Sequence, residues 1–363
     1  MTHTRPSRPG AHVLGVDSGG SGLRVAVGRV GTSGPLSTTV CAEPVRTGAG
    51  GIDAGHLLEQ LVPAARELLE QATASATDDE GGGEVAAVAI GAAGMATLGE
   101  RLRAELPGAL AEALGVRRLA LAADAVTAYA GAVGQRPGAV VAGGTGMIAL
   151  GTDLKEWRRA DGWGHLLGDS GGGAWIGRAG LDAAMRAHDG RRGGSPALLE
   201  RLRAVFGPAE ALPGLLYPRP DRPAVLASFA PEVAACAGVD PVAAGILRQA
   251  AGHIAEAAAA VCPTAAGAAG ETETGGEVAL TGGLFRMGEP LVNPVREELA
   301  RLAPGARVTA AEGDPLTGAL RIARALAAGE LLLPHHPTML FVPGEGPAGR
   351  HGRADALDGA GAG

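Results

Sequence analysis

The sequence predicts an α/β protein with two related halves, and three observations support this fold class. Short apolar segments of strand length alternate with longer segments of helical periodicity along most of the 363 residues. A strand, a glycine-rich turn and a second strand occur at His12–Val27 and again at Ala139–Leu150. Several apolar strands end in glycine-rich turns. We therefore expect two halves of similar topology, without a residue-by-residue repeat, whose turns line a cleft between them.

The first half is expected to follow the order strand, strand, strand, helix, strand, helix, strand, helix. Asp53 is a candidate N-cap for the first helix, which carries leucines on one face. After the opening hairpin, strands are predicted at 36–45, 85–90 and 119–122, and helices at 54–74, 100–114 and 125–132.

The second half begins with the second strand–turn–strand unit and becomes mostly helical from Trp163. Helices are predicted at 174–187, 197–206, 225–237, 241–261, 291–302 and 315–328, with short strands at 278–280 and 308–310. These expectations place the domains at 11–122 and 123–333, with the final helix free to pack back on the first domain. Residues 1–10 are expected to be a disordered lead-in and 334–363 an irregular or disordered tail.

Composition and charge narrow the class of function. A formal charge of −7 and a pI near 5.8 argue against nucleic acid or an anionic membrane as the main partner. No apolar run reaches the length that a membrane-spanning helix needs. Cys41, Cys236 and Cys262 are far apart and no leader peptide is recognisable, which predicts a reducing, cytoplasmic environment. Lys155 is the only lysine, and it follows no P-loop glycines.

The first glycine-rich turn, Asp17–Gly22, has two candidate roles. Its glycines let backbone N–H groups approach an anion, Ser21 adds a hydroxyl donor, and Asp17 can hold Mg²⁺ against that anion, directly or through water. The turn can equally be an ordinary tight hairpin. Similar turns occur at Gly143–Gly146, Gly168–Gly173 and Thr281–Gly283. Together they favour a site that holds a polyphosphate by backbone donors and stabilises phosphoryl transfer electrostatically.

Phosphoryl transfer to a hydroxyl also needs a base, and Asp124 is a candidate. It stands directly after an apolar strand and before a helix, among apolar neighbours. A carboxylate at a strand end can face a cleft and accept a hydroxyl proton. It can equally cap the N-terminus of the following helix, and the residue alone favours this cap.

The segment from Trp163 to Asp169 contains the densest group of candidate substrate contacts. Sugars often rest on aromatic faces, and Trp163 is one of only three tryptophans. Asp169 can accept hydrogen bonds from substrate hydroxyls. His165 is more consistent with packing and structural hydrogen bonding than with catalysis.

Five segments resemble one family in order along the chain: GVDSGGSGLRVAV, AADAVTAYAGA, VVAGGTGMIALG, GWGHLLGDSGGGAWIGRAGL and VALTGGLF. They resemble the N-acetylglucosamine kinase branch of the acetate and sugar kinase, chaperone and actin superfamily, also described as BadF/BadG/BcrA/BcrD-type ATPases. The resemblance covers residues 12 to 330. It implies two ribonuclease-H-like (actin-like ATPase) domains, ATP and Mg²⁺ in the interdomain cleft, closure on sugar binding, and often a homodimer.

The resemblance also implies roles for individual residues. Asp124 matches the catalytic aspartate, which reverses the preference for a helix cap. The implied ATP contacts are Gly19, Gly20, Ser21, Gly144, Thr145, Gly146, Gly282 and Gly283. The implied sugar contacts are Gly162, Trp163, Gly164 and Asp169, together with Asp124.

The implied function is ATP-dependent phosphorylation of an amino sugar, with N-acetylglucosamine and its 6-hydroxyl as the first expectation. Departures from the family pattern concern mainly the sugar: the loop at 47–52 lacks an asparagine, and Ser170 replaces a glutamate. Gly22 also replaces a basic or polar residue of the first turn. Glucosamine and N-acetylmuramic acid therefore stand as alternative acceptors. A nucleotide-driven activator of a partner enzyme is a further alternative, which the scattered cysteines disfavour because such activators hold an iron–sulfur cluster.

Overall fold

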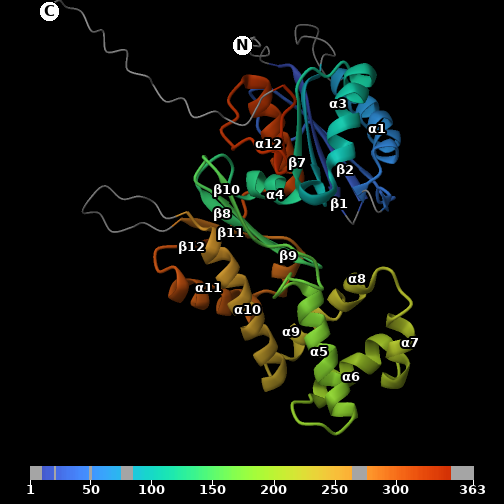
Figure 1. The fold of residues 1–363 in the computed structure, drawn as a ribbon, viewed down its shortest axis with the longest axis vertical. Coiled ribbons are helices and arrows are strands. Elements are labelled where there is room, and N and C mark those ends of the chain that lie inside the picture. The colour runs from blue at the N-terminus through green and yellow to red at the C-terminus, as the bar shows by residue number, and fades with distance from the viewer. Residues whose placement is uncertain (1–9, 20–21, 49–50, 75–84, 264–275, 345–363) are drawn as a thin grey trace, which may run out of the picture.

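The computed structural model describes residues 10–19, 22–48, 51–74, 85–263 and 276–344, which form two β-sheets (Figure 1). The first sheet has the order β13-β7-β6-β1-β2-β3. Its strands are β1 (His12–Gly19), β2 (Gly22–Arg29), β3 (Ser37–Cys41), β6 (Val85–Ala92), β7 (Leu119–Ala123) and β13 (Leu340–Phe341). The second sheet has the order β10-β9-β8-β11-β12. Its strands are β8 (Gly138–Gly143), β9 (Met147–Thr152), β10 (Trp157–Asp161), β11 (Glu277–Thr281) and β12 (Arg307–Ala310). A separate ribbon pairs β4 (Thr47–Gly48) with β5 (Gly51–Ile52).

The two sheets share one topology. In the first, β1, β2 and β3 form an antiparallel meander, and β6 and β7 continue parallel to β1. In the second, β8, β9 and β10 form the meander, and β11 and β12 continue parallel to β8. Parallel neighbours need crossover connections, which the helices supply. The predicted two related halves of α/β type are confirmed.

Helices cover both sheets, and one pair lies between them. On the first sheet, α1 (Ala54–Ala74) packs with α3 (Glu100–Leu114), and α12 (Pro315–Ala328) packs on β1 and β6. Figure 1 shows α1 and α3 on one side of this sheet and α12 on the other. Helix α4 (Asp124–Ala132) contacts α12 and strands of both sheets. The final helix thus packs back on the first half, because its one buried face, which includes Leu320 and Ala323, needs that apolar surface.

The remaining helices belong to the second half. Helix α10 (Pro241–Val261) packs on β8, β9 and β10, with α11 (Glu289–Leu302) beside it. The others are α5 (Gly173–His188), α6 (Pro196–Phe206), α7 (Leu212–Leu216), α8 (Arg222–Ala227) and α9 (Ala230–Cys236), with the short α2 (Met95–Leu98) in the first half. Single-turn 3₁₀ segments lie at Ala209–Ala211 and Gly283–Met287.

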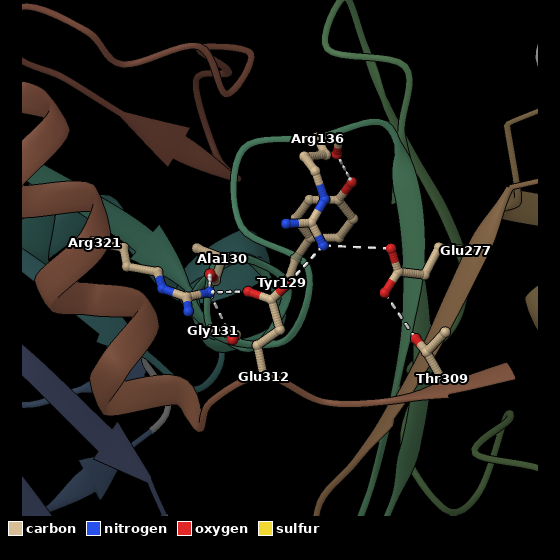
Figure 2. Close-up of polar contacts among 8 residues, drawn as sticks. All are labelled: Tyr129, Ala130, Gly131, Arg136, Glu277, Thr309, Glu312 and Arg321. Carbon is tan, nitrogen blue, oxygen red and sulfur yellow. Dashed lines mark hydrogen bonds and ion pairs between the residues drawn. The ribbon is translucent and has the colours of Figure 1, made fainter. Parts of the chain in front are cut away.

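The chain passes between the halves after α4 and again before α12, and an ion-pair network joins these two passages. Arg136 contacts Glu312 at 2.7 Å and Glu277 at 3.4 Å, and Arg321 contacts Glu312 at 3.2 Å. Arg321 also donates to two carbonyls at the end of α4, each at 3.0 Å. We call Arg136, Glu277, Glu312 and Arg321 the crossing network (Figure 2). It links β11, α4 and α12 where the two halves meet.

Each of the two larger sheets contains one strand that was not predicted. Within the expected irregular tail, Leu340 and Phe341 form β13, paired antiparallel with Ala122 and Leu121 of β7. Two residues are too few to show a periodicity, so only the tertiary pairing reveals this strand. Strand β10 was also missing from the predicted elements. The remainder of the expected tail, 345–363, and nearly all of the expected lead-in lie outside the described residues.

The described residues contain neither a disulfide nor a single helix with the length and hydropathy of a membrane span. Arg222–Cys236 and Pro241–Val261 have that length and hydropathy only together, as a pair bent by 118°. Apolar residues of α10 such as Leu247 and Ile254 are buried in the core of the second half. Cys41, Cys236 and Cys262 are free thiols.

Candidate active site

The candidate active site is a cavity of about 880 Å³ where strands of both sheets end. Its walls come from the carboxyl ends of β1, β7, β8 and β11, from the starts of α4 and α12, and from the segment after β10. In open α/β sheets, ligands bind beyond the carboxyl ends of the strands. The shared topology therefore brings together turns that are far apart in sequence.

Most of the predicted site residues line this cavity. They are Asp17, Gly19, Asp124, Gly144, Gly146, Gly162, Gly164, Asp169, Gly282 and Gly283. Thr145 and Trp163 belong to the same loops but are not among the lining residues. Gly20 and Ser21 fall outside the described residues.

At the first glycine turn, Asp17 forms an ion pair that sequence analysis does not predict. Arg24, on the neighbouring strand β2, donates from Nε and Nη2 to Asp17 Oδ2 at 3.0 and 2.6 Å. Its Nη1 donates to Asp314 Oδ2, at the start of α12, at 2.6 Å. All three side chains line the cavity. A guanidinium therefore lies beside the first turn, although Gly22 stands where the resemblance leads one to expect a basic or polar residue.

A magnesium ion would fit this wall with the Asp17 carboxylate as one of its ligands, rather than in a preformed protein cage. In nucleotide sites, Mg²⁺ is usually held by one or two carboxylates together with substrate phosphates and waters. Arg24 occupies Asp17 Oδ2, whereas no described residue donates a hydrogen bond to Oδ1. Within the described part of the chain, no three His, Cys, Asp or Glu side chains are grouped to hold a metal ion. The residues present suit an ion that also binds the substrate's phosphates.

Asp124 combines the geometry of a helix cap with an open carboxylate oxygen. Its Oδ1 accepts a hydrogen bond from the N–H of Ala125 at 2.8 Å, in the first turn of α4. No residue in the described ranges donates to Oδ2. The side chain of Asp124 is accessible to solvent through the cavity, although protein atoms surround its carboxyl group. These surroundings displace water from the carboxylate and so raise the pKa of Asp124. The negative charge of Asp17 adds to the rise, whereas the hydrogen bond from the Ala125 N–H and the positive charge of Arg159 oppose it.

The second glycine turn, between β8 and β9, is braced by the start of α5. The carbonyls of Gly144 and Thr145 accept hydrogen bonds from the first two N–H groups of α5, at 2.9 and 2.8 Å. On the other side, Gly146 lies against Asp169, and a Cβ at position 146 would come within 2.2 Å of Asp169 Oδ2. Only glycine allows this approach. The turn is therefore held both by a helix and by the neighbouring wall.

That neighbouring wall, the segment 161–170, is held together by hydrogen bonds that its own carboxylates accept. Asp161 Oδ1 accepts from the N–H of Asp169 at 2.5 Å, and its Oδ2 accepts from the N–H of Ser170 at 3.0 Å. Asp169 Oδ1 in turn accepts from the N–H of Gly164 at 2.9 Å. Asp161 and Asp169 both have positive φ angles, of 61° and 56°, which aspartate tolerates better than most residues. We call this segment the 161–170 wall.

The pKa of Asp169 is raised chiefly because the wall buries its carboxyl group. The hydrogen bond from Gly164 opposes this rise, and the negative charge of Asp161 adds to it. Oδ1 of Asp169 therefore accepts a hydrogen bond within the wall, and its Oδ2 lies close to the second glycine turn.

Arg159, on β10, donates hydrogen bonds to backbone carbonyls of the same wall. Its Nε donates to the carbonyl of Asp161 at 3.0 Å, and its Nη2 donates to the carbonyl of Gly162. Its guanidinium carbon lies 4.2 Å from the centre of the Trp163 ring. One face of the Trp163 ring is thus covered by Arg159, while 62% of Trp163 remains exposed.

Sequence analysis does not identify four charged residues that line the cavity: Arg24, Arg159, Arg286 and Asp314. A signal exists for Arg24, because it interrupts an apolar strand directly after the glycine turn, whereas the other charge of that strand, Arg29, stands at its end. Arg159 lies in a short strand with two arginines, where nothing local distinguishes the inward one. Asp314 reads as an ordinary helix cap, and it also caps α12 by accepting from Thr317.

A comparison with protein families agrees with this geometry. The model of the BadF/BadG/BcrA/BcrD ATPase family matches residues 14–323. The chain belongs to this family. The matched part of this BadF/BadG/BcrA/BcrD-type chain contains both glycine turns, Asp124 and the 161–170 wall.

Solved structures of similar fold include two proteins provisionally named N-acetylglucosamine kinases. The one from Chromobacterium violaceum is 28% identical, with a TM-score of 0.62 and coverage of 86% of this chain and 99% of that one. The one from Porphyromonas gingivalis shares the fold at 17% identity, with a TM-score of 0.60 and coverage of 85% and 96%.

A curated relative matches a shorter segment more strongly. The N-acetylmuramic acid/N-acetylglucosamine kinase of Clostridium acetobutylicum is 43% identical over 79 residues. That segment is 21% of this BadF/BadG/BcrA/BcrD-type chain and 25% of the relative, so the chain matches about a quarter of the relative's length.

Proposed function

We propose that the protein is an ATP-dependent kinase that phosphorylates a hydroxyl of an amino sugar, with N-acetylglucosamine and its 6-hydroxyl as the first candidates. The observation that carries this proposal is Asp124 Oδ2, an open carboxylate oxygen in a cavity that also contains two glycine turns and the 161–170 wall. The names of the Chromobacterium and Clostridium relatives support the same class of reaction.

In the proposed reaction, Asp124 accepts the proton of the sugar hydroxyl while the hydroxyl oxygen attacks the γ-phosphorus of ATP. The bond between that phosphorus and the β–γ bridging oxygen breaks, and ADP leaves. The raised pKa of Asp124 brings the carboxylate closer to the basicity that a general base needs. The reaction is chiefly a matter of positioning and of stabilising the charge on the transferring group.

The cavity supplies groups for both substrates. The backbone around Gly19, Gly144 and Gly146 would face the phosphates, with Ser21 and Thr145 adding hydroxyl donors. Gly282 and Gly283 would lie at the adenosine end. Gly162, Trp163, Gly164 and Asp169 would form the sugar side. Mg²⁺ held by Asp17 would neutralise charge on the β- and γ-phosphates.

The proposal is tested by measuring ADP release with a panel of sugars: N-acetylglucosamine, glucosamine, N-acetylmuramic acid and glucose. We expect at least one amino sugar to give turnover. The variant Asp124→Asn should then lose about 1000-fold in kcat while still binding ATP, because general-base catalysis contributes ~10²- to 10⁴-fold. Asp182→Asn, an exposed aspartate on α5, is the matched control and should keep full activity. Substantial turnover by Asp124→Asn would refute the assignment of the base.

The homodimer that the resemblance implies and the cytoplasmic location that the scattered cysteines predict also stay proposals. Light scattering of the purified chain and fractionation of cells test them.

A further inference from the structure

Arg159 presents one edge of its guanidinium to no described protein group. The group carries five N–H donors in a fixed planar fork. Nε and one N–H of Nη2 form one edge, which donates to the carbonyls of Asp161 and Gly162. One face is covered by the indole of Trp163. The end edge, formed by Nη1 and the second N–H of Nη2, is left for a ligand, and Arg159 lines the cavity.

The positive charge of Arg159 also lacks a direct counter-ion among the described residues. Arg24, the other inner cation of the cavity, contacts two carboxylates at 2.6 Å each. Arg159 is half-buried, yet the described residues place no carboxylate within 4.0 Å of its nitrogens. The charges of Asp124 and Asp169 act on it only from farther away. A half-buried guanidinium with a free fork is the arrangement that proteins use to bind a carboxylate or phosphate in bidentate fashion.

The position of Arg159 favours the acceptor over the nucleotide as the source of this anion. Arg159 holds Asp161, Gly162 and Trp163, which belong to the wall proposed to contact the sugar. The phosphates have a separate cation, because Arg24 lies beside the first glycine turn. Arg286 lines the cavity next to Gly283, at the end proposed for adenosine. Each ligand region thus has its own arginine, and Arg159 is the one at the sugar wall.

We propose that Arg159 is a specificity-determining residue whose free edge binds a carboxylate on the acceptor, so that the preferred acceptor is an amino sugar with an acidic substituent. This inference rests on the proposed kinase function and deepens it, by moving the first candidate acceptor from the neutral N-acetylglucosamine to an acidic amino sugar. A bidentate pair suits a planar carboxylate on a flexible side group of the sugar, while Asp124 stays next to the reacting hydroxyl. A neutral amino sugar would leave the guanidinium solvated but unpaired.

The test compares three acceptors: N-acetylmuramic acid, its methyl ester and N-acetylglucosamine. The acid and the ester have the same ring and differ in one negative charge and in the methyl group of the ester. We expect kcat/KM for the acid to exceed that for the ester by about 10- to 100-fold, the range of a charge-assisted hydrogen-bonded pair. In Arg159→Met, the ratio should fall to within about threefold of one. Arg159→Lys, which keeps the charge but not the fork, should restore part of it.

A matched control is Arg158→Met. Arg158 is the preceding residue of β10, is exposed and pairs with Glu156, so its loss should leave the acid-to-ester ratio unchanged. Calorimetric binding of acid and ester to the Asp124→Asn variant measures the same preference without turnover. Thermal unfolding of each variant checks that the fold is kept. If Arg159→Met fails to fold, the intermediate acid-to-ester ratio expected of Arg159→Lys carries the test, and an unchanged ratio in Arg159→Lys would then contradict the inference.

The outcomes separate the two proposals. If sugars are phosphorylated but the acid and its ester react alike, the inference about Arg159 is wrong and the kinase function stands. If Arg159→Met lowers kcat/KM equally for all three acceptors, Arg159 acts on the wall or on a phosphate, and the inference is again wrong. If no sugar is phosphorylated or bound, the kinase proposal itself fails, and the inference fails with it.

Discussion

The carboxylates of the cavity and those of the crossing network differ in their surroundings. In the cavity, the pKa values of Asp124 and Asp169 are raised, chiefly because burial disfavours the charged form. In the crossing network, the pKa of Glu312 is lowered, chiefly because Arg136 donates a hydrogen bond to it. Asp314 is only two residues from Glu312, yet it pairs with Arg24 in the cavity.

This difference shows how the protein divides its charged groups between reactivity and stability. An ionised Asp124 lowers the stability of the folded state and keeps one oxygen open to a substrate. An ionised Glu312 contributes stability, but Arg136 and Arg321 already occupy its oxygens. We therefore expect changes in the cavity to act mainly on turnover, and changes at the crossing to act mainly on stability.

Next to the loss of kcat expected of Asp124→Asn, the largest effect on turnover is expected from Asp17→Ala. This change removes the carboxylate proposed to anchor Mg²⁺ and leaves Arg24 paired only with Asp314. We expect kcat/KM to fall about 100- to 1000-fold, as when one preorganised electrostatic group is lost. ADP release measured over a range of Mg²⁺ concentrations checks this result. Glu312→Gln is the control and should keep its kcat/KM. A similar loss of kcat/KM in both variants would contradict the proposed difference between the cavity and the crossing network.

A large effect on stability is expected from Gly318→Ala, where α12 crosses α4. A Cβ at this position would come within 1.9 Å of the Thr127 carbonyl oxygen and 2.5 Å of the Gly131 nitrogen, both backbone atoms. The helices must then move apart, and we expect the free energy of unfolding to fall by about 3 kcal/mol. Denaturant unfolding measures the loss. Gly245→Ala in α10 is the control, since its Cβ would meet nothing within 4 Å and helix propensity favours alanine by up to ~1 kcal/mol.

A smaller loss of stability is expected from Glu312→Gln. Its ion pairs are half-exposed, so we expect about 0.5–1 kcal/mol at neutral pH and low salt, and less at high salt. Because the folded-state pKa of Glu312 is lowered, its contribution is present above the unfolded pKa and disappears as pH falls through the folded one. Thermal unfolding from pH 7 down to acid pH follows this loss. A difference that persists unchanged under acid conditions would exclude an ionic origin.

The smallest effect on stability, with the opposite sign, is expected from Asp124→Asn. The folded-state pKa of Asp124 is raised, so its stability contribution is present below the unfolded pKa and is lost as pH rises through the folded pKa. At pH 7 the neutral asparagine should therefore raise Tm by about 1 °C, and the gain should vanish toward acid pH. Calorimetry of both proteins at several pH values checks this sign. A lower Tm for the variant at pH 7 would mean that the Ala125 hydrogen bond outweighs the burial of charge.

Local patterns account for the parts of the fold and site that sequence analysis predicted. The turns around Asp17 and Gly144 are visible because glycines interrupt alternating or apolar strands, which is a property of neighbouring residues. Asp124 is visible because it stands between a strand and a helix. Strand β10 escaped prediction because its edge position and three charged residues hide an apolar pattern.

Contacts between charges were not predictable in the same way. Arg24 and Asp314 are 290 residues apart, and only the return of α12 to the first sheet brings them together. The free edge of Arg159 becomes apparent only when its contacts with Asp161, Gly162 and Trp163 are known. No local periodicity encodes either arrangement.

The sequence by itself determined two related α/β halves, glycine turns at their strand ends, and a family of proteins that this chain resembles. These follow from hydrophobic periodicity and from backbone freedom, which act over a few residues. The tertiary structure alone decided which arginine meets which carboxylate, and which carboxylate oxygens and guanidinium edges stay open. Those pairings depend on where distant segments cross, because charges interact through space and not along the chain.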